Sequence, residues 1–347
     1  MKKLPEDDLQ HVLDLTAPFW KQVTNSTFFI TGGTGFFGKW LVSSLLYINN
    51  KLGLNNKVIV LTRSSDNFLK LNPWFEREPA ITFITGDVRD FPFPNVNIDY
   101  IIHAATEASV TLNINEPLLM YDVIVEGTRN ILEMARLKGV KGVLHTSSGA
   151  VYGAQPSNIT HLPENFIGCP DVYQSNAAYA EGKRVAEMLA AIYKRKHNVS
   201  AKIARCYAFS GPYLPLNGTF AFGNFIEDVL ANRDINLSGD GTAYRSYLYA
   251  SDLVVWLLTI LFAGDDCMPY NVGSDEDVTI ADLARTIAKH GNRILDVKIA
   301  GKPILGVKPL RYVPDVSRCK NQLGLRINVS LEEGIKKTLA FYKQSYE

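Results

Sequence analysis

The segment TFFITGGTGFFG, residues 27–38, decides the fold. Its first five residues are apolar or β-branched and predict a buried strand, and a helix is predicted over residues 36–50. Between the two, Gly32 permits a tight turn, Gly35 lets backbone approach a pyrophosphate, and Gly38 allows close packing of helix on strand. The helix N-terminus adds N–H donors for an anion. The segment therefore predicts a dinucleotide-binding turn.

Strands and helices alternate in the chain beyond this turn. Further strands are predicted over residues 57–62, 81–85, 98–103, 142–147 and 201–206, and helices near 66–73, over 117–138 and over 177–197. Short apolar strands separated by helices are typical of a parallel sheet covered on both faces. Right-handed crossovers make such a sheet doubly wound. We therefore expect an α/β fold, a Rossmann-type doubly wound parallel sheet with a smaller C-terminal α/β lobe.

The chain is predicted to have three parts. Residues 1–25 contain a leading amphipathic helix over 6–22, which caps the sheet or extends an interface. Residues 26–206 form the NAD(P)-binding domain, and residues 207–347 mainly form a substrate lobe with segments that return to the main domain. The lobe contains a turn-rich segment, 239–247, and predicted helices over 222–232, 250–263, 279–290 and 330–345.

The composition excludes several classes of protein. The chain has 36 Lys and Arg and 35 Asp and Glu, so its net charge is only +1. Because nucleic acids and anionic membranes attract a concentrated positive charge, neither is expected as a partner. The apolar stretch 253–263 is too short to span a bilayer, and the first residues do not form a signal peptide. The 4 cysteines are scattered singly, which is typical of reduced thiols in a cytoplasmic protein and predicts no metal site.

The end of the second strand selects between NAD and NADP. An acid there binds the adenine ribose hydroxyls, whereas an arginine accepts a 2′-phosphate. The chain has Arg63 and Ser64, with no carboxylate until Asp66, so NADP is slightly favoured; a solvated Arg63 would leave NAD open. Further cofactor contacts are predicted from the glycine turn and the ends of the third and fourth strands: Phe36, Phe37, Asp87, Val88, Ala104, Ala105 and Thr106.

Tyr179 and Lys183 form a candidate catalytic pair. Their i, i+4 spacing places both on one face of the predicted helix. An ammonium beside a phenol, with a positive nicotinamide near, is expected to lower the pKa of Tyr179 toward neutrality. Tyr179 can then take a proton from a substrate hydroxyl as hydride leaves the carbon, and return it in reverse. Lys183 also serves as a cofactor contact.

A cluster of hydroxyls ends the strand predicted over 142–147. Ligands of open α/β sheets bind at the carboxyl ends of the strands, so Ser147 and Ser148 are predicted to contact substrate. Ser148 would hydrogen-bond the reacting hydroxyl and complete the catalytic set with Tyr179 and Lys183. The structural alternative is a serine-rich turn that bonds its own backbone.

At these residues the chain resembles the extended short-chain dehydrogenase/reductases, in particular the NAD-dependent epimerase/dehydratase family that acts on nucleotide sugars. The resemblance covers residues 26–345 and implies that Ser148, Tyr179 and Lys183 are catalytic. Its ordered motifs are TGGTGFFG (31–38), HAAT (103–106), TSSGAVYG (146–153), YAEGK (179–183), RCYAFSGP (205–212), GDGTAYRSYLYASDL (239–253) and YVPDVSRCKNQLG (312–324).

The resemblance also assigns a substrate and an assembly. It implies that Arg245 and Arg311 grip a nucleotide diphosphate in the lobe, where guanidinium groups suit phosphate oxygens; a surface ion pair is the alternative for each. It further implies a homodimer through helices 117–138 and 177–197. Met120, Ile131, Ala135, Ala186 and Leu189 are candidates for that face, with packing on the sheet as the alternative.

Several positions depart from the family pattern. The 4,6-dehydratases carry an acid and a base where this chain has Gly149 and Ala150, so dehydration is not expected unless Glu107, Asp171 or Glu181 reaches the sugar. Two family asparagines are replaced as well, by Ile124 and Ala208.

The Ser-Ser-x-x-Val-Tyr-Gly form looks more like the 4-epimerases. The leading hypothesis is therefore a redox-neutral nucleotide-sugar epimerase that works through a transient keto sugar. The alternatives are a 4,6-dehydratase, decarboxylase or 4-keto reductase of the same family, and a cofactor-binding sensor without catalysis.

Overall fold

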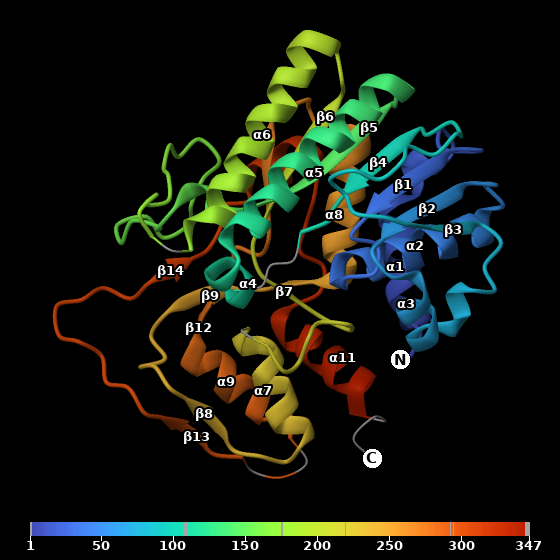
Figure 1. Ribbon diagram of the computed structural model, residues 1–347. Helices are drawn as coiled ribbons and strands as arrows, with labels where there is room; N and C mark the ends of the chain where they lie inside the picture. The colour runs from blue at the N-terminus through green and yellow to red at the C-terminus, as the bar shows by residue number, and fades with distance from the viewer. Residues whose placement is uncertain are drawn as a thin grey trace. The chain divides into compact units, whose positions relative to one another are not determined.

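A seven-stranded sheet organises the first part of the chain (Figure 1). The computed structural model describes residues 2–106, 110–174, 176–218, 220–291, 293 and 295–343. The strand order is β11-β6-β5-β4-β1-β2-β3, and the pairings from β6 to β3 are all parallel. The strands are β1 Thr27–Thr31, β2 Lys57–Thr62, β3 Ile81–Thr85, β4 Tyr100–His103, β5 Gly142–Ser148, β6 Ala201–Cys206 and β11 Pro269–Val272. This confirms the predicted doubly wound α/β sheet.

Helices cover both faces of this sheet, and alternate residues of β1 contact the two layers. Phe29 packs in a cluster with α5 and α6, whereas Phe28 meets Phe262 of α8, with the ring centroids 6.4 Å apart. Figure 1 shows α5 and α6 side by side. The helices concerned are α1 Glu6–Trp20, α2 Phe36–Leu52, α3 Ser65–Leu71, α4 Val110–Asn115, α5 Pro117–Lys138, α6 Ala177–His197 and α8 Ala250–Ala263, with 3-10 turns at Pro73–Phe75 and Gly149–Tyr152.

The leading helix α1 packs on the last turn of α8. The rings of Phe19 and Trp20 lie 5.3 and 5.6 Å from the ring of Phe262, and the Trp20 indole donates to Thr16 Oγ1 at 2.9 Å. Acidic residues in its first turn suit the positive end of the helix dipole. Of the two roles considered for this helix, capping the sheet or extending an interface, these contacts suit the first, since Phe28 of β1 meets the same Phe262 ring.

The chain divides into two compact units. The first contains Met1–Gly153, Ile167–Cys206 and Val254–Tyr270, and the second contains Ala154–Phe166, Tyr207–Leu253 and Asn271–Glu347. Further elements of the second unit are β7 Phe209–Ser210, α7 Ala221–Leu230, β8 Ile235–Leu237, β9 Tyr244–Ser246, β10 Leu248–Tyr249, β12 Asp277–Thr279, α9 Ile280–Ala288, β13 Val297–Ile299, β14 Arg311–Tyr312, α10 Ser317–Leu323 and α11 Leu331–Lys343.

The structure differs from the sequence predictions mainly in the second unit. Residues 239–247 were predicted as turns, but β9 lies within them because it pairs with β12 and β14, which are distant in sequence. The short helices α4 and α10 were not predicted. The end of the helix predicted over 330–345 lies outside the described residues.

No helix in the described part of the chain is long and apolar enough to cross a membrane. The apolar helix α8 is instead a core helix, since Val254, Trp256 and Leu257 are fully buried.

Candidate active site

The glycine turn between β1 and α2 is closely packed. Gly32 has a φ of +69°, and a Cβ there would lie 2.4 Å from the Ala104 carbonyl oxygen. A Cβ on Gly38 would lie 2.2 Å from the Gly32 carbonyl oxygen. Neither position admits a side chain. Gly38 thus permits the first turn of α2 to pack on the loop itself, rather than on the strand as expected.

The outer side of the same turn is open. A Cβ on Gly35 would meet only the Gly32 oxygen, at 3.4 Å. Gly35 is the N-cap of α2, no side chain caps the helix, and its first turn contains no acid, so its N–H groups suit an anion. Phe36 and Phe37 begin the helix and are partly buried. These features fit the pyrophosphate of a dinucleotide.

Thr31 joins this turn to the end of β4. Its Oγ1 accepts the N–H groups of Ala104 at 3.2 Å and Ala105 at 3.1 Å, and lies 2.8 Å from His103 Nδ1. The backbone of the two alanines, which are predicted to face the cofactor, is therefore held by a residue to which the sequence analysis assigned no role.

The residues predicted to contact the adenosine half of the cofactor lie in different surroundings. Asp87 accepts three hydrogen bonds of 2.9 Å from the backbone and guanidinium of Arg89, which together lower its pKa. The Val88 side chain is buried in the core against Gly127. Arg63 and Ser64 are exposed at the end of β2.

The structure brings the three predicted catalytic residues together. Ser148 ends β5, is buried, and hydrogen-bonds the side chain of Tyr179. The Lys183 ammonium lies 5.9 Å from the centroid of the Tyr179 ring. Ser148 Oγ also accepts the Ala150 N–H at 3.1 Å, so the serine turn considered as the alternative forms as well.

Lys183 is held by β5 and by a residue in the segment that follows β4. Its Nζ donates to the Thr146 carbonyl oxygen at 2.7 Å and to Thr106 Oγ1 at 3.0 Å. Burial lowers the pKa of Lys183 to about 8, against the opposing effects of Cys206 and Glu187. Thr106, predicted as a cofactor contact, thus also orients the lysine.

The polypeptide alone raises the pKa of Tyr179, whereas the expected fall involved a nicotinamide near the phenol as well as Lys183. Desolvation of the phenol raises its pKa, and the hydrogen bond with Ser148 opposes this effect. The Lys183 ammonium is directed at Thr146 and Thr106. The polypeptide by itself therefore favours the phenol over the phenolate.

Ser147 points away from Ser148. Its hydroxyl donates to Glu187 Oε1 at 2.5 Å, so it is occupied by α6, whereas a substrate contact was predicted. Glu187 also accepts two hydrogen bonds from Arg205, at 3.0 and 2.6 Å. The sequence analysis missed Glu187 and Arg205. A signal for Glu187 was present, since Tyr179, Lys183 and Glu187 recur every four residues.

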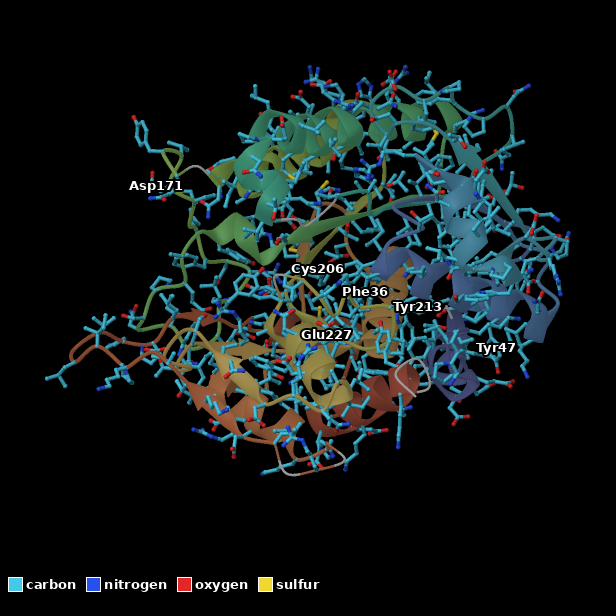
Figure 2. The ribbon with its side chains drawn as sticks, turned by 60° about the horizontal axis from the view of Figure 1, so that its bottom comes forward. Phe36, Tyr47, Asp171, Cys206, Tyr213 and Glu227 are labelled. Atoms are coloured by element: carbon cyan, nitrogen blue, oxygen red, sulfur yellow. The ribbon has the colours of Figure 1, made fainter. Side chains whose placement is uncertain are left out.

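Two of the three carboxylates considered for dehydration, Asp171 and Glu181, have partners elsewhere. Asp171 is exposed and accepts the Tyr173 N–H at 3.0 Å (Figure 2); Glu181 forms an ion pair with Arg184 at 3.5 Å. Figure 2 shows Asp171 on an outlying loop, in contrast to Cys206 in the interior. Glu107 lies outside the described residues.

Arg245 and Arg311 lie on neighbouring strands of the second unit, β9 and β14. Arg311 forms an ion pair with Asp277 at 2.5 Å and stacks on Tyr244, 3.9 Å from the ring centroid. Arg245 Nη1 donates to the Tyr244 carbonyl oxygen at 2.7 Å. The ion pair considered as the alternative for Arg311 is therefore present.

The predicted dimer residues on α5 and α6 are buried within the chain. They therefore belong to the core, in agreement with the alternative of packing inside the chain. These residues are Met120, Ile131, Ala135, Ala186 and Leu189. Ile124 is also buried, and a Cβ on Gly182 would lie 3.3 Å from it, so Gly182 lets the two helices approach closely. The exposed apolar side chains of these helices are Leu118, Leu119, Leu137 and Met188.

A glycine turn at the end of β1, together with Ser148, Tyr179 and Lys183 at the end of β5, defines a Rossmann-type enzyme of the short-chain dehydrogenase/reductase class. The chain belongs to the NAD dependent epimerase/dehydratase family, whose model matches residues 28–273. This confirms the predicted family, and with it an NAD-dependent enzyme.

Relatives and solved structures agree with this placement. The chain is 33% identical to UDP-glucuronic acid decarboxylase 5 of Arabidopsis thaliana over 316 residues, 90% of this chain and 88% of the relative. It is 26% identical to the dTDP-glucose 4,6-dehydratase of Streptomyces venezuelae with NAD bound (TM-score 0.77; 92% and 97% of the two chains). The UDP-glucose 4-epimerase of Thermotoga maritima, 24% identical, shares the fold (TM-score 0.76; 92% and 100%).

Proposed function

We propose that the protein oxidises a nucleotide sugar at a ring carbon and reduces the keto sugar again, without net consumption of cofactor. The observation that carries this proposal is the contact of Ser148 with Tyr179 beside the buried Lys183. The set suits removal of a hydroxyl proton, and Gly149 and Ala150 beside it supply no acid or base for elimination of water.

Each residue has a separate task in this reaction. Ser148 and Tyr179 would hold the reacting hydroxyl, and Tyr179 would take its proton and later return it. Lys183, fixed to β5, would keep a positive charge beside the phenol. Gly32, Gly35 and Gly38 would hold a dinucleotide, which supplies a hydride acceptor when bound.

UDP-glucuronic acid is the substrate that the relatives favour. Oxidation at C4 makes its carboxylate a β-keto acid, so the C5–C6 bond breaks, CO₂ leaves, and C5 of the resulting enolate takes a proton from water before hydride returns to C4. Loss of CO₂ from such an acid needs no side-chain acid, which suits Gly149 and Ala150. Decarboxylases at 33% and 32% identity support this reaction.

The second candidate is 4-epimerisation. It is favoured by the form of residues 146–153, TSSGAVYG, which is similar to that of the 4-epimerases. An epimerase rotates the keto sugar and returns hydride to its other face, which likewise needs no carboxylate at positions 149 and 150.

One experiment separates the candidates. Purified protein is incubated with UDP-glucuronic acid or UDP-glucose and NAD, and products are identified by mass and NMR. A UDP-pentose with released CO₂ supports decarboxylation, and an isomer of unchanged mass supports epimerisation. The Tyr179→Phe variant serves as the control for cofactor binding. If the wild type binds cofactor as well as this variant does but converts neither sugar, the proposal for UDP-sugars is overturned.

We also propose the finer features of the site and assembly. The exposed Arg63 and Ser64 support acceptance of NADP beside NAD. Arg245 and Arg311, on paired strands, support a nucleotide-sugar role for the second unit. The exposed apolar residues Leu118, Leu137 and Met188 support a homodimer through α5 and α6.

A further inference from the structure

Glu187 lies at the centre of a polar network in the first unit. Its Oε1 accepts from Ser147 Oγ at 2.5 Å and from Arg205 Nε at 3.0 Å, and its Oε2 accepts from Arg205 Nη2 at 2.6 Å. The side chains of Arg205 and Glu187 are 14% and 12% exposed. A bidentate pair shielded from water is geometrically demanding, so it fixes the elements that carry it.

The network joins the elements that carry the catalytic residues. Ser147 precedes Ser148 on β5 and is the register partner of Arg205 on β6. The Arg205 guanidinium lies 4.6 Å from the ring centroid of Tyr152, in the turn that follows Ser148. Glu187 stands two helical turns beyond Tyr179, so the pair sets the position of α6 against the end of β5.

Glu187 also acts on Lys183 by charge. It lies one helical turn beyond the lysine. Its carboxylate raises the pKa of Lys183 and so opposes the effect of burial, which lowers that pKa. Among the residues that the structure describes, the other ionisable groups that face Lys183 are His103 on β4, His145 on β5, Cys206 on β6 and Tyr179 on α6. Burial lowers the pKa of both imidazoles and raises that of the thiol, so these groups stay neutral near neutral pH.

We propose that Glu187 is a positioning residue: through Ser147 and Arg205 it holds α6 so that Tyr179 meets Ser148, and its charge supports the Lys183 ammonium. The effect of Glu187 on turnover rests on the proposed function. The positioning of α6 by Glu187 rests on the hydrogen bonds alone.

The test is Glu187→Gln in the full chain with cofactor bound. Glutamine keeps the shape and an acceptor for Ser147 but removes the charge. We expect a fall in kcat of about tenfold, with KM and cofactor affinity within about twofold, and a basic limb of the kcat profile that moves to lower pH. Glu133→Gln is the matched control, since it removes the charge from the half-exposed pair with Arg136 on α5.

A second measurement does not depend on turnover. The Lys183 Nζ signal is followed against pH by nitrogen NMR and assigned with Lys183→Met. Its midpoint should fall in Glu187→Gln and stay unchanged in Glu133→Gln. An unshifted midpoint in folded Glu187→Gln would overturn the inference. If the wild type converts no nucleotide sugar but the midpoint shifts, the proposed reaction fails while the action of Glu187 on Lys183 stands.

Discussion

Lys183 Nζ donates to the main-chain oxygen of Thr146, 2.7 Å away. The lysine of α6 is thereby fixed to the strand that ends in Ser148, two residues further on. A hydrogen bond to main chain does not depend on a second side chain, so it survives substitutions around it. Tyr179 lies one helical turn before Lys183, so this contact acts together with the Glu187–Arg205 pair in placing it.

Removal of the phenol should abolish chemistry but not binding. Tyr179→Phe keeps the ring and deletes the proton carrier, so turnover should fall by about 10²–10⁴-fold. Cofactor content, measured by absorbance after denaturation, should match the wild type. Turnover equal to that of the wild type would contradict the role of Tyr179.

The glycine turn should not tolerate a methyl group. In Gly38→Ala the Cβ would lie 2.2 Å from the Gly32 oxygen, so the turn must move and cofactor affinity should fall at least about tenfold. Titration calorimetry with NAD measures this. Gly239→Ala is the control, because a Cβ there meets nothing within 4 Å. Equal affinities in the two variants would remove the turn from the cofactor site.

Activity should decline in mildly alkaline solution. Burial lowers the pKa of Lys183 from 10.5 to about 8, so its ammonium is present below that pH and is lost above it. If this charge supports the reaction, kcat falls as the pH rises through about 8. A stopped assay over this range tests the point, and a flat profile up to the ordinary pKa of lysine would contradict it.

Arg63 should distinguish the two cofactors. A guanidinium at the end of β2 can bind a 2′-phosphate, which NAD lacks. Arg63→Ala should therefore weaken NADP binding by about tenfold and leave NAD binding within about twofold. The dissociation constants come from fluorescence titration. Parallel losses for both cofactors would point to a general effect on the turn instead.

The proposed homodimer should depend on the outer surface of α6. Met188 is 53% exposed, so a charge there costs the folded monomer little but opposes an apolar interface. Light scattering after gel filtration should show a dimer for the wild type and a monomer for Met188→Asp. A monomeric wild type would end the dimer proposal.

Much of the fold was predictable because its signals are local. The strands at 27–31, 57–62 and 201–206 and the helices at 117–138 and 177–197 were predicted with the bounds that the structure has. Each carries its own apolar pattern, which needs no distant partner. The strand β9 was missed because its hydrogen bonds go to β12 and β14, far away in sequence.

The same distinction applies to the candidate site. The spacing of Tyr179 and Lys183 was visible, but the occupation of Ser147 by Glu187 was not, because that contact depends on how α6 lies across β5. Ile131 illustrates the point for assembly. The sequence pattern of an apolar helix residue is the same whether the residue faces the core or a partner subunit. Only the burial of Ile131 within the chain shows that it faces the core.

The order of residues along the chain alone determined the glycine turn, the parallel sheet and the presence of a Tyr–Lys pair, since these follow from stereochemistry and helical spacing. The tertiary structure decided which way the charges act. It directed the Lys183 ammonium at Thr146 and Thr106, and it desolvated the Tyr179 phenol, which raises the pKa of Tyr179 in the polypeptide. Hydrogen-bond partners and desolvation are properties of neighbours in space, and neighbours in space come from all parts of the chain.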